Sequence, residues 1–376
     1  MEGAAVRLPG RPLTALTEGP ILSVTTPVLA HIDVPEHAFD GAVPLVTVMR
    51  GEYVGGLHRG MAAAVDSAGD ELIAIGDTGQ RVFLRSGAKP FQLMPAVLSG
   101  AVDRFGVTQQ ELAVLAASHH GEQGHIEAVY SVLAKAGLEE SALHCGIHPP
   151  LSEEAARVRW REGKDPSPVC NNCSGAHTGM LLACLTNGWP LDSYGLAGHP
   201  LQIETRAILA TFAGMPEGEI QLAVDNCDVP TFRIPLRSAA LAFARLASGA
   251  AVPTALATAA RRIRDAMTSH PTMVGGTVSF DSALMAAARG QIVCKGGAEA
   301  FQGVGIVAPG AGVALKVADG GSRAVPPACL AILSQLGALN SDARQSLIPY
   351  FEPDVRNRRG EVVGCLRPAF HFEPGA

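Results

Sequence analysis

Strand-like segments stand at both ends of this chain and enclose one long helical region. Near the N-terminus, short apolar runs such as residues 45–48 and 61–65 alternate with turn residues, and the pattern returns after Gln291. Such runs between turn residues are typical of β-hairpins. From Pro90 to about Ala288 the spacing of apolar residues is mostly helical. The layout predicts an α/β (α+β) fold, in which N- and C-terminal strands share one antiparallel sheet beside a large helical insertion.

The same pattern gives the expected domain boundaries. Residues 1–40 are rich in Pro, Gly and Thr and show no sustained period, so we expect an N-terminal extension outside the core fold, with disorder as one interpretation. Residues 41–376 are expected to form a single unit. Within it, residues 41–85 and 290–376 would form the sheet subdomain, and residues 86–289 the mainly helical one.

Several elements can be bounded more closely. Thr108-Gln-Gln-Glu111 has the pattern of a capping box ahead of an apolar helix. Further helices are expected over residues 126–136, 152–162, 174–187, 201–212, 238–247, 255–267 and 327–336, and strands over 291–294, 304–308, 313–317 and 361–366.

Composition and charge exclude several classes of partner. Hydrophobic residues make up 47% of the chain and charged residues 17%, which is typical of a well-buried globular protein. The net charge is −6 and no stripe of Lys and Arg with interleaved aromatics occurs, so we expect no nucleic-acid partner. No run approaches the roughly 18–20 apolar residues of a membrane span, so we expect no membrane partner.

The cysteines and the N-terminus indicate the cellular compartment. A basic segment followed by an apolar one is missing at the N-terminus, so secretion is not signalled. Eight cysteines in 376 residues without such a signal favour reduced thiols or metal ligands over a disulfide framework. We therefore expect a cytoplasmic protein.

Ser86-Gly-Ala-Lys89 sets a hydroxyl and an amine three residues apart, where an apolar run ends and a helix begins. On one face of a turn, the lysine amine can take the serine proton and make the hydroxyl a nucleophile. Pro90 disfavours helical torsions at Lys89, so Lys89 is expected at the very start of the helix or in a tighter turn. An N-cap serine with an exposed lysine fits the same four residues.

Two further segments supply the same residue types. Ser118 follows an apolar helix and precedes a His-His-Gly loop, where its hydroxyl fits either a cleft or a helix cap. Lys295 ends a strand directly before Gly296 and Gly297, and glycine lets a ligand approach the backbone closely. A solvated lysine at an ordinary strand end fits equally.

The order of these three segments, and the expected topology, resemble the serine β-lactamases and penicillin-binding proteins. Over longer stretches, roughly residues 43–340, the chain resembles the asparaginase II family, the rhizobial-type L-asparaginases. The motifs that carry this resemblance are Arg85-Ser-Gly-Ala-Lys-Pro-Phe-Gln92, Ala117-Ser-His-His-Gly-Glu122, Cys145-Gly-Ile-His148, Asn171-Asn-Cys-Ser-Gly175, Cys227-Asp-Val-Pro-Thr-Phe232 and Lys295-Gly-Gly-Ala-Glu299.

The resemblance implies a serine β-lactamase-like fold and an amidohydrolase that converts L-asparagine to L-aspartate and ammonia with two Ser/Lys pairs. Matched position by position, the pairs are Ser86 with Lys89 and Ser118 with Lys295. One serine attacks the amide, ammonia leaves, and water hydrolyses the acyl-enzyme. Ser86 is our choice of nucleophile because of its helix-turn position, with Ser118 and Lys295 as proton relay. The family alone implies a homodimer.

The cysteines raise the question of a metal. Cys170 and Cys173 have C-x-x-C spacing, and Cys227 and His177 would complete a zinc set, although buried reduced cysteines fit as well. The resemblance implies zinc held by Cys173, a lysine at position 176 and Cys227. This chain carries Ala176, whose methyl group binds no metal. Either Cys170 supplies the third ligand, or zinc is weak or missing.

Some residues are expected to bind the substrate, each with a structural role as the alternative. The absence of a lysine at position 176 affects the expected specificity for asparagine, because a lysine there would also bind the α-carboxylate of that substrate. The segment from Asp225 to Asp228 also carries more negative charge than the glycine-rich version expected there. The expected substrate-binding residues are Arg59, His148, Asn172 and Gly296.

Two other functions remain open beside the hydrolysis of asparagine. A serine hydrolase of another small amide or a β-lactam would use the same residues. The expected cytoplasmic location counts against this function, since penicillin targets lie outside the membrane. A non-catalytic binding protein of the same fold would have lost its metal ligand at Ala176. The presence of both serines and both lysines argues against that function. All three hypotheses involve a small-molecule ligand.

Overall fold

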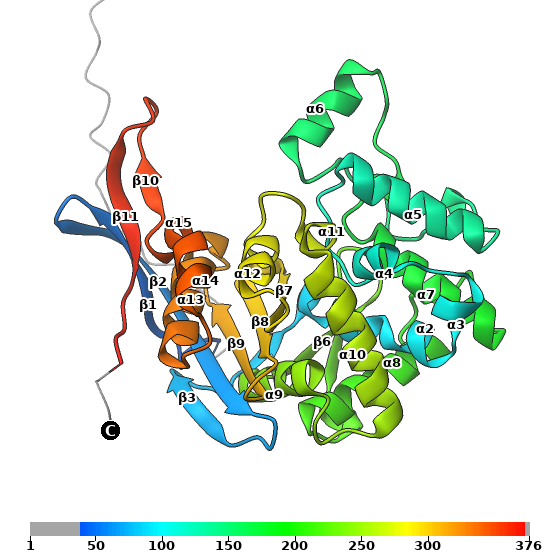
Figure 1. The fold of residues 1–376 in the computed structure, drawn as a ribbon, viewed down its shortest axis with the longest axis horizontal. Helices are drawn as coiled ribbons and strands as arrows, with labels where there is room; N and C mark the ends of the chain where they lie inside the picture. The colour runs from blue at the N-terminus through cyan, green and yellow to red at the C-terminus, as the bar shows by residue number, and fades with distance from the viewer. Residues whose placement is uncertain (1–37, 373–376) are drawn as a thin grey trace, which may run out of the picture. The chain divides into compact units, whose positions relative to one another are not determined.

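An antiparallel sheet joins the two ends of the chain (Figure 1). The computed structural model describes residues 38–372, so the expected extension over residues 1–40 lies almost wholly outside the described part. Within that part, eight strands form the sheet in the order β10-β11-β1-β2-β9-β8-β7, with β3 paired to β2. Strands from both ends of the sequence therefore share one sheet, as expected.

The N-terminal strands are two consecutive hairpins. β1 (Val43–Arg50) pairs with β2 (Tyr53–Asp66), and the far end of β2 pairs with β3 (Glu71–Ile75). Both hairpins were expected from their turn residues. The long strand β2 is the second strand of the first hairpin and the first strand of the second.

The C-terminal strands complete the sheet on both sides of this pair. β9 (Ala311–Val317) pairs with β2 from Gly60↔Val317 to Asp66↔Ala311, and β11 (Val362–Pro368) pairs with β1. The remaining strands are β8 (Phe301–Ile306), β7 (Ile292–Gly297) at one edge and β10 (Asp354–Arg356) at the other.

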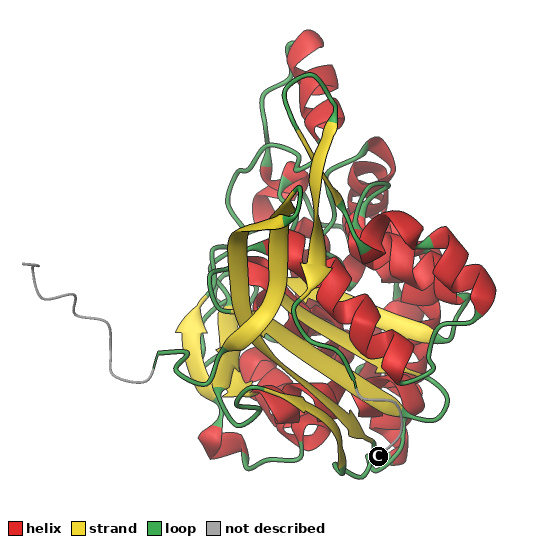
Figure 2. Ribbon diagram, turned by 90° about the vertical axis from the view of Figure 1, so that its left-hand side faces the viewer, coloured by secondary structure: helices red, strands yellow, loops and turns green. Residues whose placement is uncertain are grey.

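Helices cover both faces of the sheet centre (Figure 2). Every residue of β8 and β9 is buried, and successive side chains of a strand point to opposite faces, so neither face is open to water there. α9 (Leu236–Ser248) packs on β2, β8 and β9, and α13 (Val325–Gln335) packs on β1, β8, β9 and β11.

The helical region lies between β4 (Arg81–Phe83) and β7 in sequence. One of its helices, α7 (Ser174–Asn187), has the predicted bounds. The predicted capping box is present, because Thr108 and Glu111 each accept the backbone N–H of the other. The remaining helices are α1 (Lys89–Gln92), α2 (Met94–Leu98), α3 (Ala101–Arg104), α4 (Gln109–Leu115), α5 (Gln123–Lys135), α6 (Glu153–Arg161), α7 (Ser174–Asn187), α8 (Pro200–Ala213), α10 (Thr254–Ser269), α11 (Pro271–Gly275) and α12 (Phe280–Ala288), followed after α13 by α14 (Ser341–Ser346) and α15 (Ile348–Phe351).

A small second sheet interrupts the region expected to be helical. β4 (Arg81–Phe83), β6 (Pro230–Pro235) and β5 (Gln221–Val224) pair in the order β4-β6-β5. β5 is exposed throughout and β6 is mostly buried, so neither shows the alternation that marks a half-buried strand. β4 thus belongs to the small sheet, although all of residues 41–85 were expected in the sheet subdomain.

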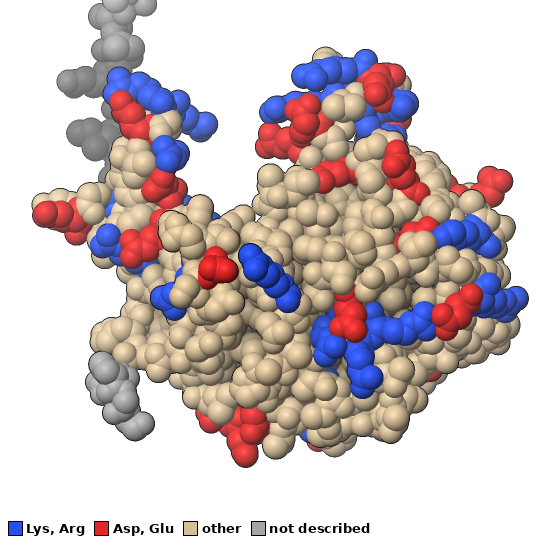
Figure 3. Space-filling model, viewed as in Figure 1, with Lys and Arg blue, Asp and Glu red and all other residues tan. Residues whose placement is uncertain are grey.

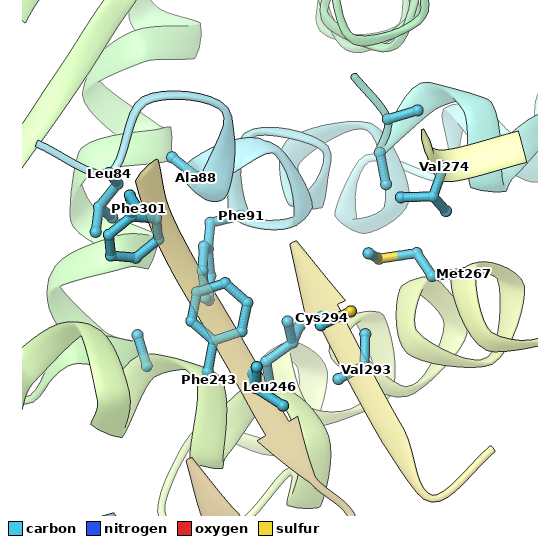
Figure 4. Close-up of a cluster of buried hydrophobic side chains, with 14 of the residues drawn as sticks. Leu84, Ala88, Phe91, Phe243, Leu246, Met267, Val274, Val293, Cys294 and Phe301 are labelled. Atoms are coloured by element: carbon cyan, nitrogen blue, oxygen red, sulfur yellow. The ribbon is translucent and has the colours of Figure 1, made fainter. Parts of the chain in front are cut away.

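An aromatic cluster joins the sheet to the helical region (Figure 4). The ring of Phe243 on α9 lies 5.7 Å from that of Phe91 and 6.5 Å from that of Phe301 on β8. Gly303, also on β8, has no room for a side chain, because a Cβ there would meet the Phe243 ring. The cluster lies directly under the segment from Leu84 to Ala88.

On the surface in Figure 3, charges of both signs gather over α6 and near β10 and β11, and much of the remaining face is uncharged. α6 itself contains two glutamates and three arginines. Among residues 38–372, no helix combines the length and apolarity needed to cross a membrane.

We expect Gly303→Ala to destabilise the protein by about 1–3 kcal/mol, because the added methyl group overpacks the aromatic cluster. Gly124→Ala on α5 is the matched control, since a Cβ there meets nothing within 4 Å, and its effect should stay within about 0.5 kcal/mol. Urea denaturation of both variants measures the difference. Equal stability of the two variants would contradict the packing of Phe243.

Candidate active site

Ser86 lies in a tight turn that ends at the start of a helix. Residues Arg85–Ala88 form a 3₁₀ helix, and α1 follows directly, with Lys89 as its first residue and Pro90 as its second. The N–H of Lys89 donates to the carbonyl of Ser86. Residues three apart eclipse one another in a 3₁₀ helix, so Ser86 and Lys89 share one face. The expectation from Pro90, a helix start or a tighter turn, agrees with this geometry.

The turn packs against the edge strand β7 almost backbone to backbone. A Cβ at Gly297 would meet the carbonyl oxygen of Leu84, and a Cβ at Gly87 would meet the ring of Phe301. Only glycine at both positions permits this approach. The packing brings the Ser86 segment to the strand that carries Lys295.

Ser86 lines a pocket of about 220 Å³. Its side chain is half-buried, and its hydroxyl has no hydrogen-bond partner within residues 38–372. A reachable hydroxyl without a partner is free to approach a bound ligand. The other lining residues are Arg85, His148, Leu151, Asn171, Asn172, Cys173, Asp225, Asn226, Cys227 and Ala298.

Lys89 is 3% exposed and lies beside this pocket. Its Nζ donates to Ser118 Oγ at 2.7 Å and lies 3.2 Å from Cys173 Sγ. A third, longer contact of 3.5 Å joins Nζ to the carbonyl of Asn172. The structure thus joins Lys89 to Ser118 by a hydrogen bond, whereas the expected pairing was Ser86 with Lys89 and Ser118 with Lys295.

Lys295 is also buried, and an unexpected carboxylate compensates its charge. Its Nζ donates to the carbonyl of Gly296 at 2.8 Å and lies 3.5 Å from Asp281 Oδ2. Burial lowers the pKa of Lys295, the charge of Asp281 opposes that change, and the charge of Lys89 adds to it. The charge of Lys89 thus acts on Lys295, the second lysine that the family resemblance assigns to the site.

Asp281 was missed because nothing in the sequence connects the start of α12 with β7. It accepts the N–H of Gly296 at 2.8 Å and the side-chain amide of Gln302 at 2.9 Å. These bonds fix the end of β7, so Asp281 positions Lys295 rather than lining the pocket.

A second unexpected group, Arg85, borders the pocket. Its guanidinium donates twice to Asp225 Oδ1, at 3.0 and 2.8 Å, and also to Glu299 and Asn226. The hydrogen bond with Asp225 raises the pKa of Arg85. The charge of Asp225, one of the two carboxylates that distinguish this segment, is therefore balanced within the site.

The expected substrate-binding residues separate into two groups. His148 and Asn172 line the pocket, and the Asn172 side chain has no hydrogen-bond partner within the described residues. Arg59 lies elsewhere, on β2, where its guanidinium donates to the carbonyl of Ala42. Gly296 lies beside Lys295 but outside the pocket lining. The structure thus brings only two of the four residues to the pocket.

Cys173 and Cys227 form a thiol pair in the pocket wall. The hydrogen bond from Cys227 and the charge of Lys89 lower the pKa of Cys173, against the effect of burial. The same bond, together with burial, raises the pKa of Cys227. The pair therefore favours one thiolate on Cys173 and one thiol on Cys227.

The side chains around this pair do not complete a zinc site. Ala176 supplies no donor atom, and Cys170 contacts Ser167 at 3.8 Å instead of joining the pair. His177 directs its Nδ1 to Tyr194. Among residues 38–372, no three His, Cys, Asp or Glu side chains gather in a way that could hold a metal. The nitrogen next to Cys173 is that of Lys89.

Comparisons with solved structures give distant matches. Crystal structures of a protein named Mglu match with a TM-score of 0.36 and 16% identity, over 76% of this chain and 68% of that one. Mglu in its native form matches with a TM-score of 0.35 and 16% identity, over 76% of this chain and 67% of that one. Mglu in its glutamate form matches with a TM-score of 0.35 and 17% identity, over 76% of this chain and 62% of that one. The serine β-lactamase-like fold and the homodimer stay predictions.

The sequence comparisons identify the family. Among curated proteins there is no match. The profile of the L-asparaginase II family, in contrast, matches residues 46–368, which include both serines, both lysines and the thiol pair. This match supports a hydrolase-type enzyme with a small-molecule substrate. The chain belongs to the L-asparaginase II family.

Proposed function

We propose that this protein is an amidohydrolase that converts L-asparagine to L-aspartate and ammonia through a serine acyl-enzyme. The observation that carries the proposal is the position of Ser86: its unpartnered hydroxyl lines a small pocket, in the same turn as the buried Lys89. A nucleophile with an amine base on the same face of a turn is the minimal machinery for acyl transfer.

Ser86 is the better nucleophile of the two serines. It is a pocket-lining residue, whereas Ser118 is not, and the Ser118 hydroxyl is already held by Lys89 at 2.7 Å. The Ser86 oxygen attacks the side-chain carbonyl carbon of the substrate, and its proton passes to Nζ of Lys89, which reaches the amine form by giving one proton to the Cys173 thiolate 3.2 Å away. An amine has one lone pair and two protons, so Lys89 can accept from Ser86 while donating to Ser118.

Ser118 and Lys295 supply the remaining proton steps. As the carbon–nitrogen bond breaks, the departing amide nitrogen takes up a proton through Lys89 and Ser118 and leaves as ammonia. Water then attacks the Ser86 ester, giving L-aspartate and restoring the Ser86 hydroxyl. Lys295, whose pKa is lowered by burial, accepts the proton of the attacking water, and this proton then passes to the Ser86 oxygen as the ester bond breaks.

The main chain offers the groups that stabilise the tetrahedral intermediate. The N–H of Ser86 lies in the first turn of a helix, where backbone amides have no acceptor within the helix. Such amides stabilise negative charge developing on the carbonyl oxygen. For the amino-acid part of the substrate, the free side-chain amide of Asn172 offers both a donor and an acceptor. No step in this scheme passes through a metal.

We expect Ser86→Ala to reduce kcat/KM for ammonia release from L-asparagine at least about 10³-fold, because the acyl-enzyme cannot form. Ser118→Ala should cost about 10²-fold, the effect of losing one proton-transfer group. Ser99→Ala, whose hydroxyl only bonds the Ala96 carbonyl, should remain near the wild type and is the control. An active Ser86→Ala enzyme, or a larger loss in Ser118→Ala, would disprove this assignment of roles.

The pH dependence tests Lys295 separately. Since a lysine accepts a proton only as the neutral amine, activity should rise as the pH increases through the pKa of Lys295. Asp281 opposes the lowering of that pKa, so Asp281→Asn should move the rising limb of kcat/KM to lower pH. Asp103→Asn, at an exposed carboxylate paired with Arg262, controls for the loss of charge. A limb that stays in place or moves to higher pH argues against this role.

A further inference from the structure

A second pocket, of about 310 Å³, lies on the other side of the segment that borders the Ser86 pocket. Asp225 and Cys227 line the first pocket, whereas Val224 and Asp228, from the same segment, line the second. Its volume is at the lower end of that of small-molecule sites. The lining residues are His144, His177, Asp192, Ser193, Gly195, Leu196, Ala197, Leu222, Ala223, Val224, Asp228 and Pro230.

A buried hydrogen-bond donor without a partner belongs to this pocket. His177 is 1% exposed, and its Nε2 has no hydrogen-bond partner within the described residues. Nδ1 lies 2.6 Å from the Tyr194 hydroxyl, whose oxygen already accepts the His144 N–H at 2.8 Å. We assign the Tyr194 proton to the hydrogen bond with Nδ1, the acceptor nearest to that hydroxyl, and with this assignment Nε2 carries the ring N–H. An unpaired buried N–H is costly, so it favours a ligand with an acceptor.

Two carboxylates accompany this donor. Asp192 and Asp228 both line the pocket, and neither side chain has a hydrogen bond or ion pair within residues 38–372. The lining residues include no Lys or Arg, so no permanent cation in the pocket wall balances the two negative charges. The unbalanced negative charge favours a cationic group on the ligand.

Apolar side chains form the remaining wall. Leu196 and Val224 are 66% and 72% exposed, and Leu222 extends the same apolar surface because it shares a face of β5 with Val224. β5 is the edge of the small sheet, so this surface is open to a ligand.

We infer that this pocket binds a free α-amino acid with an apolar side chain. The ammonium group would pair with Asp192 and Asp228, and the carboxylate would accept the N–H of His177. The side chain would pack on Leu196, Leu222 and Val224. The site is separate from the proposed catalytic pocket, and the two share no lining residue.

Isothermal titration calorimetry of the full chain with L-leucine tests the inference. We expect one saturable site, with at least tenfold weaker binding of 4-methylpentanoate, which lacks the amine, and of 3-methylbutylamine, which lacks the carboxylate. Ala223→Phe adds a bulky ring to the pocket lining and should weaken leucine binding at least tenfold. Ala134→Phe, the same change at an exposed site on α5, should leave it within twofold. Thermal melting checks that both variants fold.

Asp228→Asn removes one carboxylate with little effect on the backbone. Asp228 has φ of +67°, a conformation that asparagine also tolerates, so a tenfold loss of leucine binding would reflect the charge. Leucine should also shift the ¹⁵N resonance of His177 Nε2. The inference fails if leucine does not bind saturably, if Ala223→Phe binds it like the wild type, or if the His177 resonance does not change.

Discussion

The close packing of the Ser86 turn on the edge strand β7 is the constraint on which the site depends. Gly87 and Gly297 leave no room for a Cβ on either side, so the turn and the strand are held at backbone distance. Below the turn, Phe243 and Phe301 fill the core and support it (Figure 4). This packing joins segments from the start and the end of the helical insertion, and it brings the turn before Lys89 against the strand that carries Lys295.

Burial of two lysines beside each other is costly unless their charges are compensated. Lys295 has the carboxylate of Asp281 at 3.5 Å, and Lys89 has the sulfur of Cys173 at 3.2 Å. Arg85 and Asp225 form a third pair at the pocket rim. The side-chain nitrogen that contacts Cys173 is thus that of Lys89, from the turn. The metal-binding lysine that the family resemblance implies is absent, because this chain has Ala176 at that position.

The sequence was sufficient for the features that depend on local pattern. Strand and helix periodicity predicted the shared sheet and the helical insertion, whereas the grouping of the Ser86, Ser118 and Lys295 segments into one site was implied by the family resemblance. The partners of the lysines could not be predicted, because Asp281 and Ser118 reach them only through tertiary packing. β5 and β6 lack alternation. Arg59 was expected to bind the substrate, although its guanidinium is bound to the Ala42 carbonyl, directly before β1.

The central claim is that Ser86 carries the acyl group. The most direct measurement is rapid acid quenching of the enzyme during turnover of L-asparagine, followed by proteolysis and mass spectrometry of the peptides. The account predicts an aspartyl ester on Ser86. An ester on Ser118, or a thioester on Cys173, would contradict it.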